Sequence, residues 1–391
     1  MKPKQTFAAH YDAIVVGARC AGASTAMLLA RQGARVLVVD WAEPGSDTMS
    51  THALMRGAVM QLNRWGVLDT IVAAGTPAIR TTTFQYGDSV VPLAIKPSHG
   101  VDALYAPRRT VLDRALIDAA RQAGADVRFG VSFKDVIRDP QGRVVGALLG
   151  PIDSKVQEVR ADIIIGADGR RSSVARRVDA RTQCQARNSI ACVFAYFDGI
   201  RDTGTRWLYG AGTGAGKIPT NDGQHCIFAA MSQERFQTDI RVGQVADPLQ
   251  AVLDEIDPAF GAQVALGQRR SNAQTFAGHK GYIRKSWGPG WALVGDAAYF
   301  KDPLTAHGIT DALRDAEGLA NAVSAGTYQA LETYQRNRDG LSHDLFEISD
   351  EIAGMQWSFS ELQALHMKLN AALSAEQDWI IDNYDVTALA A

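Results

Sequence analysis

The chain has 391 residues, 46% of them hydrophobic and 21% charged, which is an ordinary globular composition in a chain long enough for two domains. Its formal net charge of −2 gives no electrostatic reason to expect nucleic acid or an anionic membrane as a partner. The N-terminus lacks an apolar signal core, no apolar run is long enough to span a membrane, and the four cysteines form no C-x-x-C pair, so we expect a cytoplasmic protein without a metal site.

The first predicted elements form a strand–helix–strand unit. Apolar runs at 11–16 and 34–39 are typical of buried parallel strands. Between them, residues 22–32 show small and apolar side chains at helical spacing, and Gly33 is placed to end the helix. A unit of this length and order is the usual start of a nucleotide-binding domain.

The loop inside this unit reads VVGARCAG and matches the dinucleotide pattern G-x-G-x-x-G imperfectly. Gly17 and Gly22 take the first and third glycine positions, whereas Arg19 stands at the second. Asp40 closes the second strand, where an acid can accept hydrogen bonds from an adenosine ribose. These residues favour dinucleotide binding, with NAD or FAD equally open, over a purely structural turn.

The middle of the sequence alternates helical and strand-like segments. We expect helices at 53–72, broken near Gly66, and at 110–123; strands at 81–105, 127–137, 144–149 and 155–160; and a very apolar strand at 161–169. From 188 to 285, strand-like runs are interrupted by one predicted helix at 248–256. A strand at 291–294 follows, and the remainder reads mostly as helix.

Two further strands end at acid–glycine pairs. Asp168 and Gly169 follow one of them and precede a serine-capped helix. Gly295 and Asp296 follow the other, and Asp296 is placed to bind a polyol hydroxyl. Each pair taken alone is more typical of a structural turn than of a ligand site.

Beyond Asp296, Pro303 gives the loop rigidity, and a helix opens near Gly308. The backbone N–H groups of Ile309 and Thr310 at that helix start are available to an acceptor, helped by the helix dipole.

Taken together, the three motifs resemble those of the class A flavoprotein monooxygenases, the family of para-hydroxybenzoate hydroxylase. The glycine loop, the central Asp-Gly pair and the late Gly-Asp pair occur in the family's order and at about its spacing, over roughly residues 10–345. The resemblance implies FAD held by the first and third motifs, NAD(P)H as a transient co-substrate, and no separate nicotinamide domain. It also implies an α/β fold: a Rossmann-like FAD-binding domain of the GR2 type with an inserted sheet-rich substrate domain and C-terminal helices.

The domain division expected on this basis is discontinuous. Residues 1–80, 105–187 and 280–345 are assigned to the FAD-binding domain. Residues 81–104 and 188–279 are assigned to the substrate domain, and 346–391 to a C-terminal helical segment.

The resemblance assigns roles position by position. Gly17 and Gly22 match the pyrophosphate loop, Asp40 the ribose acid, Asp168 the acid that serves both FAD and the nicotinamide, and Asp296 the ribityl acid. Arg56 aligns with an arginine near the FAD phosphates, and Arg109 with one that opens the helix beside the cofactor. The expected cofactor-binding residues are Gly17, Arg19, Ala21, Gly22, Asp40, Trp41, Arg56, Arg109, Asp168, Gly295, Asp296, Gly308, Ile309 and Thr310. The catalytic candidates are Pro303, near the reactive C4a face, and His307.

The sequence also departs from the family pattern. Tyr299 replaces the histidine of G-D-A-A-H, Thr305 stands at the usual loop glycine, and Thr310 replaces an asparagine at the helix start. His307 lies at a variable position and is more readily a structural residue than a base. Histidines 52, 99 and 225 are weaker candidates for a base. Aromatic residues of the inserted region line either a pocket or a core: Phe194, Tyr196, Trp207, Tyr209 and Phe228.

The implied reaction is hydroxylation of an aromatic or other electron-rich small molecule by NAD(P)H and O2, through a C4a-hydroperoxyflavin. The chemistry belongs to the cofactor, and the protein stabilises charge and excludes water. An FAD-dependent reductase of the geranylgeranyl reductase type is the main alternative. A flavin-dependent halogenase is less favoured, because the W-x-W-x-I-P motif and a catalytic lysine are not apparent, and a non-catalytic flavin-binding protein also stays open. We expect a monomer or homodimer, and Arg19 beside the cofactor.

Overall fold

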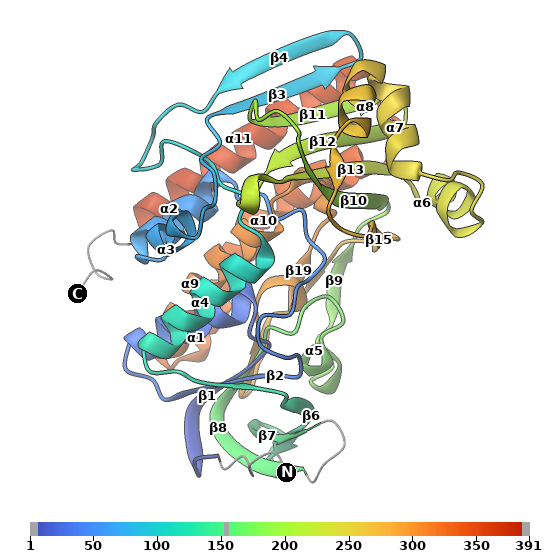
Figure 1. Ribbon diagram of the computed structural model, residues 1–391. Coiled ribbons are helices and arrows are strands. Elements are labelled where there is room, and N and C mark those ends of the chain that lie inside the picture. Colours follow the sequence, from blue (N-terminus) through green and yellow to red (C-terminus); the bar gives the residue numbers. More distant parts are fainter. Residues whose placement is uncertain (1–6, 152–155, 385–391) are drawn as a thin grey trace.

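A computed structural model describes residues 7–151 and 156–384, and its backbone forms two large sheets joined by helices (Figure 1). The first sheet has the strand order β17-β18-β8-β1-β2-β5, with the β6–β7 hairpin added to β8. Its strands are β1 (His10–Val16), β2 (Val36–Asp40), β5 (Asp126–Phe129), β6 (Ser132–Arg138), β7 (Val144–Gly150), β8 (Gln157–Gly166), β17 (Trp287–Gly288) and β18 (Trp291–Leu293). β18, β8, β1, β2 and β5 run parallel to one another, so their carboxyl ends share one edge, whereas β17 pairs with β18 in the antiparallel sense.

The two faces of this sheet belong to two different hydrophobic cores, because side chains alternate along a strand. Ala13 and Val15 face a core shared with α1 (Cys20–Arg31), α4 (Arg109–Gln122) and α9 (Gly308–Ala325). Ile14 and Val16 face the opposite core, which the β6–β7 hairpin and α5 (Ser173–Arg177) cover. The sheet is therefore buried on both faces, as its apolar runs predict.

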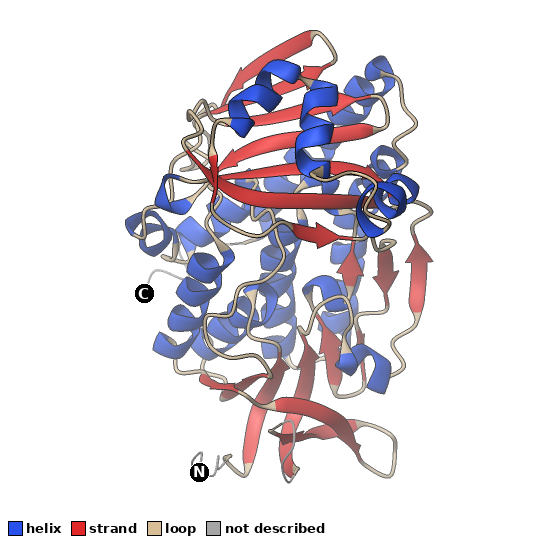
Figure 2. Ribbon diagram, turned by 45° about the vertical axis from the view of Figure 1, so that its right-hand side comes forward, coloured by secondary structure: helices blue, strands red, loops and turns tan. Residues whose placement is uncertain are grey.

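The second sheet has the order β14-β10-β13-β12-β11-β3-β4, with β15 paired to β10. It draws on two separate parts of the sequence, since the early strand β3 joins β11 in the sheet's parallel pairing. Its strands are β3 (Thr81–Tyr86), β4 (Ser89–Ala94), β10 (Ile190–Asp198), β11 (Thr205–Gly210), β12 (Thr213–Pro219), β13 (His225–Ser232), β14 (Gln268–Arg269) and β15 (Gln274–Phe276). Figure 2 shows helices lying across the outer face of this sheet, where α7 (Pro248–Ile256) and α8 (Pro258–Ala265) enclose a core of their own.

The inner face of the second sheet is turned toward the helices that pack on the first sheet and toward α11 (Phe359–Asn383). A small sheet, β19-β16-β9, lies beside the two large ones. The remaining elements are β9 (Thr182–Gln185), β16 (Tyr282–Arg284), β19 (Tyr299–Phe300), α2 (Arg56–Arg64), α3 (Leu68–Ala73), α6 (Gln233–Phe236), α10 (Tyr328–Ala353) and short turns of helix at Asn221–Gly223, Gln237–Arg241, Gly295–Ala297 and Pro303–Thr305.

Several sequence expectations need correction. The strands expected at 155–160 and 161–169 are one continuous strand, β8, which ends at Gly166; residue 155 lies outside the described residues, as do 1–6 and 385–391 of the expected domain segments. Helix 248–256 is found as expected, but α6 and α8 also lie in that region. The strands expected over 81–105 end at Ala94. α10 continues without a break across the expected boundary at 345/346, and the domain division stays a prediction.

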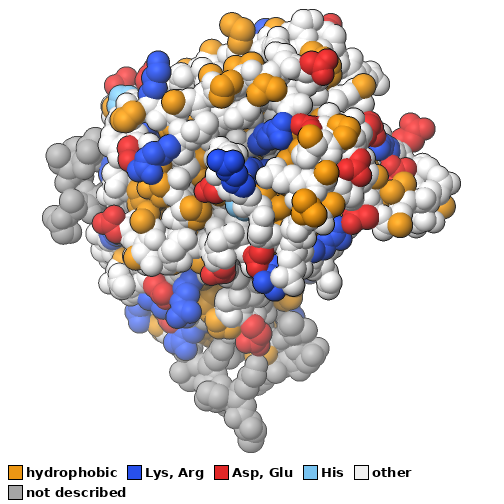
Figure 3. Space-filling model, turned by 45° about the horizontal axis from the view of Figure 1, so that its top comes forward, with side chains coloured by type: hydrophobic (Ala, Val, Ile, Leu, Met, Phe, Trp, Pro, Cys, Tyr) orange, Lys and Arg blue, Asp and Glu red, His pale blue; other side chains and the backbone are white. Residues whose placement is uncertain are grey.

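Among the described residues, no helix combines the length and apolar character needed to cross a bilayer. Figure 3 shows positive, negative and hydrophobic side chains interspersed over one face of the molecule, without one extended patch of a single charge on that face.

Candidate FAD site

The glycine loop after β1 is shaped by close backbone contacts that exclude larger residues. Gly17 has φ 106°, and a Cβ atom there would lie 2.4 Å from the carbonyl oxygen of Ala167. A Cβ atom at Gly22 would lie 1.9 Å from the carbonyl oxygen of Gly17. Arg19, by contrast, has φ −90° and ψ −169°, an extended conformation open to any L-residue. The fold thus needs glycine at the first and third places of the pattern but not at the second.

The structure brings the three sequence motifs together at the carboxyl edge of the first sheet. The Asp-Gly turn touches the glycine loop through Ala167 and Asp168, and a Cβ atom at Gly295 would lie 2.8 Å from Cβ of Ala21. The hydroxyl of Tyr282 donates to the carbonyl oxygens of Arg170 (3.0 Å) and Asp296 (2.5 Å) and so ties the second motif to the third. Ligands of open α/β sheets bind at this kind of edge.

The three motif acids have different surroundings. Asp40 accepts hydrogen bonds from the backbone N–H groups of Ala18 (2.8 Å) and Ala42 (2.9 Å), which holds its carboxylate against the glycine loop. Asp168 accepts from the Ser172 hydroxyl (2.5 Å) and the Ser173 N–H (2.6 Å), so it orders the start of α5. Burial raises the pKa of Asp168, and these hydrogen bonds oppose the rise.

Asp296 has the most unusual carboxyl of the three. Burial raises its pKa to about 6, although the nearby guanidinium groups of Arg170 and Arg109 lower it. A carboxyl with a raised pKa beside a predicted cofactor motif is a candidate ligand-binding group.

Three helices begin at this edge without a side-chain cap: α1, α4 and α9. Helices α2 and α3 are also uncapped, whereas α5, α6, α7, α8, α10 and α11 are each capped by a serine, threonine or aspartate side chain. Unpaired N–H groups and the helix dipole make such termini favourable for phosphate and other acceptors. The three uncapped starts at this edge are those at the glycine loop, at Arg109 and at Gly308.

Unpartnered polar atoms and open space lie at the same helix starts. Arg19 Nη1, His307 Nδ1 and Thr310 Oγ1 are buried without a hydrogen-bond partner. A Cβ atom at Gly308 would meet nothing within 4 Å, and Gly308 and Pro303 are both exposed. Buried polar groups are normally paired, so these atoms fit a ligand with many acceptors and donors, as FAD has.

Arg109 and Arg56 are engaged within the protein. Arg109 donates to both carboxylate oxygens of Asp113, and the thiol of Cys20 also donates to Asp113 (3.2 Å), which joins the starts of α1 and α4. The guanidinium of Arg56 donates to the carbonyl oxygens of Lys96, Ser98 and Val101. The side chain of Arg56 is therefore directed at the 96–101 loop, although α2 begins beside Thr310.

Three other predicted residues also have definite positions. Trp41 is 68% exposed beside Asp40. The Nη2 of Arg19 makes one long contact with the carbonyl oxygen of Asp47 (3.4 Å). Ile309 is partly buried in the first turn of α9.

The turn from Pro303 to Gly308 differs from the sequence interpretation. Ala306, not Thr305, has the left-handed conformation that favours glycine, with φ 52°. Asp302 caps this turn through the Leu304 N–H (3.0 Å) and also accepts from the Ile190 N–H (2.9 Å), which fixes the turn to β10. Burial raises the pKa of Asp302 to about 7, against these hydrogen bonds.

His307 is buried, and a role for it in catalysis stays a prediction. Its Nε2 donates to Glu376 of α11 (2.7 Å). Sequence reasoning missed Glu376, Tyr282 and Asp302. The Asp-Pro pair at 302–303 is a recognisable cap signal, whereas no local pattern connects Glu376 or Tyr282 to the site.

A family profile described as "FAD binding domain" matches residues 10–349 of the chain. The chain belongs to this family of FAD-binding flavoproteins. The resemblance to the class A flavoprotein family, the FAD cofactor, the α/β FAD-binding fold and membership among FAD-dependent oxidoreductases are confirmed.

The relatives of this chain are named for several different reactions. The chain is 28% identical over 366 residues to a digeranylgeranylglycerophospholipid reductase of Methanosarcina mazei, and the alignment covers 86% of this chain and 82% of the relative. It is 26% identical over 398 residues to the monooxygenase cfoF of Aspergillus candidus, covering 88% and 90%. The structure of the flavin-dependent brominase Bmp2 superposes with a TM-score of 0.78 at 20% identity, covering 94% and 100%, which shows a shared fold.

Proposed function

We propose that this flavoprotein hydroxylates a small aromatic compound, with NAD(P)H as electron donor and O2 as the oxygen source. The observation that carries the proposal is an aromatic core between the second sheet and the FAD site. Phe194, Tyr196 and Phe228 of the sheet share this core with Tyr282 and Phe300, which adjoin the third motif. Aromatic walls suit a planar ring, because they bury it and stack against its faces.

The proposed division of labour follows from the contacts. FAD, when bound, would supply the hydride acceptance and the O2 activation. The N–H groups of Gly308, Ile309 and Thr310 would stabilise negative charge at the pyrimidine edge, and Asp296 would accept a ribityl hydroxyl. The sheet over the site would exclude water.

Tyr196 is one of the tyrosines of the aromatic core, and His52 orients its hydroxyl. The Nδ1 of His52 faces the carbonyl oxygen of Ala106 (3.0 Å), which only accepts, so Nδ1 carries the hydrogen. The Tyr196 hydroxyl then donates to Nε2 (3.0 Å). Burial and the nearby Arg108 lower the pKa of His52 to about 3, so His52 orients Tyr196 and does not serve as a base.

The prenyl-reductase alternative is favoured by the nearly full-length similarity to the archaeal reductase. A long prenyl substrate would need an extended apolar channel. Beneath β3 and β11, however, the inner face of the sheet packs against Leu362 and Leu365 of α11, and the hydroxyl of Tyr86 bonds His366 there (2.6 Å). This packing favours a small substrate.

The halogenase alternative has the fold similarity to the brominase behind it. It would need a lysine beside the substrate. Lys217 is buried within the second sheet, where its ammonium donates to the Arg201 carbonyl oxygen (2.7 Å) and the Thr203 hydroxyl (2.9 Å). Lys301 pairs with Asp311. Both lysines are committed to structural contacts.

The test is oxygen consumption by the FAD-loaded protein with NADH or NADPH and a panel of phenols and anilines. The expected result is substrate-stimulated O2 uptake with a product heavier by one oxygen atom. Anaerobic consumption of NAD(P)H with a prenyl substrate would instead identify a reductase. A bromide-dependent product would identify a halogenase, and a flavin that NAD(P)H never reduces would identify a binding protein. We also propose a cytoplasmic monomer or homodimer, which ultracentrifugation and fractionation test.

A further inference from the structure

A cluster of charged side chains is buried where α11 crosses the start of α9. Its members are Lys301, His307, Asp311, Arg314, Asp315 and Glu376, each no more than 5% exposed. Glu376 accepts from His307 (2.7 Å) and from Arg314. Arg314 also lies 2.7 Å from Asp315, and Lys301 pairs with Asp311. Buried charges are stable only when they are paired in this way.

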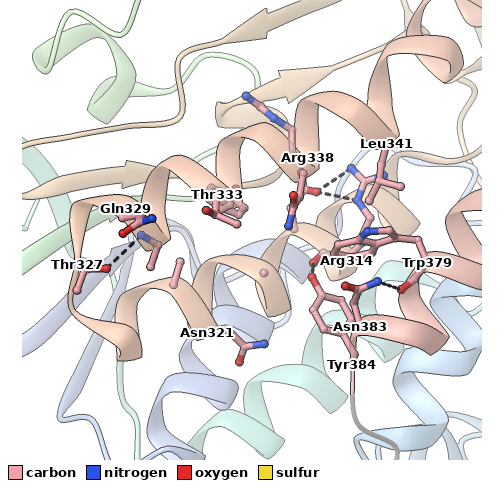
Figure 4. Close-up of a pocket in the computed structure, with 16 residues that line it drawn as sticks. Arg314, Asn321, Thr327, Gln329, Thr333, Arg338, Leu341, Trp379, Asn383 and Tyr384 are labelled. Carbon is pink, nitrogen blue, oxygen red and sulfur yellow. Dashed lines mark hydrogen bonds and ion pairs between the residues drawn. The ribbon is translucent and has the colours of Figure 1, made fainter.

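Arg314 belongs to the cluster and also lines a cavity of about 470 Å³ between α9, α10 and α11. Figure 4 shows its guanidinium bonded to a neighbouring carboxylate and the residue close to Tyr384. On α9 this cavity is lined by residues between Arg314 and Ala322, beyond the helix start. It contains none of the three cofactor motifs, so we assign it no ligand.

The cluster adjoins the part of the FAD site that is expected to receive the flavin ring. His307 is the residue before α9, and the open position at Gly308 follows it directly. Two charges of the cluster act on the carboxyl of Asp296. Asp311 raises the pKa of Asp296 and Lys301 lowers it, although both effects are smaller than those of burial and of Arg170.

Glu376 stays ionised in this setting. Burial raises its pKa, but His307 and Arg314 outweigh that effect and hold the pKa to about 2. The donor atoms of His307, Asp311 and Glu376 lie within 4.8 Å of one another, which is also close enough for a metal ion. Lys301 and Arg314 already occupy these carboxylates, so a metal cation would have to displace a protein cation.

We propose that Glu376 is a positioning residue of the FAD site: it holds His307 and the Pro303–Gly308 turn from α11, and its charge lowers the reduction potential of the bound flavin. A two-electron-reduced flavin carries added negative charge near the start of α9, and a buried carboxylate close by opposes that charge. The inference rests on the proposed seating of FAD over α9 and is independent of the substrate.

The experiment measures the midpoint potential of FAD in the full-length loaded protein, by anaerobic reductive titration against a reference dye. In Glu376→Gln, the preference for reduced over oxidised FAD should rise about tenfold, which is ~30 mV for a two-electron couple. Lys301→Gln removes a cation from the same cluster, and the preference should fall by a similar factor. Glu376→Asp keeps the charge and should change the preference for reduced FAD less than threefold. Asp378→Asn removes an exposed charge on the same helix and should leave this preference unchanged.

Shifts of opposite sign in Glu376→Gln and Lys301→Gln support the proposal. Equal potentials in both variants, or shifts in one direction, would overturn it, because loosened packing has no reason to follow the sign of the removed charge. Where Glu376→Gln does not fold, Lys301→Gln and Glu376→Asp decide: an unchanged potential in Lys301→Gln refutes the proposal. The titration uses neither O2 nor substrate, so its outcome is separate from that of the hydroxylation assay.

Discussion

Asp296 is the residue at which binding and stability are expected to conflict. Its pKa is about 6 in the folded protein, above the ordinary value near 3.9, so the unfolded polypeptide ionises first as the pH rises. Stability is therefore lost between about pH 4 and pH 6 and stays lost above that range. Asp296→Asn should stabilise the apoprotein at pH 8 by ~2 kcal/mol and flatten this pH dependence. Urea unfolding of wild type and Asp296→Asn at several pH values measures the free energy of unfolding.

The same substitution should weaken FAD binding about tenfold, because an amide is a poorer acceptor for a ribityl hydroxyl than a carboxylate. Fluorescence titration of the apoprotein with FAD gives the dissociation constant. Unchanged affinity together with higher stability would mean that Asp296 does not contact the cofactor.

Arg19 explains why the imperfect glycine pattern is compatible with FAD. Its backbone is extended, and its buried Nη1 lacks a hydrogen-bond partner that a pyrophosphate oxygen would supply. Arg19→Gly should weaken FAD binding about tenfold while it changes apoprotein stability by less than ~1 kcal/mol. Arg35→Gly tests an arginine just before β2 and serves as the control. Equal dissociation constants for wild type and Arg19→Gly would show that the guanidinium is a bystander.

At the scale of single elements, the Pro303–Gly308 turn contains an avoidable strain. Ala306 has φ 52°, a conformation that costs an L-residue ~1 kcal/mol and costs glycine almost nothing. Ala306→Gly should raise the free energy of unfolding by about 0.5 kcal/mol, because the relieved strain exceeds the added entropy of the unfolded polypeptide. Thr305→Gly is the matched variant, since Thr305 has no positive φ, and it should destabilise. Equal changes in the pair would contradict this geometry.

The elements that sequence reasoning finds are those whose signals are local. The β1–α1–β2 unit follows from apolar periodicity and Gly17, and helix α7 is found at its expected residues. Helix α8 is missed because Asp257 ends α7 and at once caps α8 through the Phe260 N–H (2.9 Å), with Pro258 in its first turn. The Asp257-Pro258 pair is a start signal like Asp302-Pro303, but it stands where α7 ends, and a proline at that place also marks the end of a helix.

The residues of the proposed FAD site also differ in whether a local sequence signal predicts them. Gly17, Gly22 and Asp296 belong to short motifs, and their meeting follows from the common edge of parallel strands. Glu376 lies on α11, 69 residues after His307, and the two side chains meet only through tertiary packing. No sequence pattern near either residue therefore predicts the contact. The direction of the Arg56 side chain is likewise a result of packing, because the 96–101 carbonyls that it binds have no sequence signature.

At the scale of the whole molecule, the proposed FAD site brings together unmet interactions from separate parts of the chain. They include the uncapped starts of α1, α4 and α9 and the unpartnered atoms of Arg19 and Thr310. A ligand that meets them binds the folded state only, so FAD at 100 times its dissociation constant should add ~2.7 kcal/mol. For a protein of this length that corresponds to about 3 °C in Tm. Calorimetry over a range of FAD concentrations checks the expected logarithmic rise. Asp296→Asn should need about ten times more FAD for the same rise, whereas Asp378→Asn should follow the wild-type curve. A Tm that does not respond to FAD would contradict the proposed site, because any ligand that binds only the folded state raises Tm.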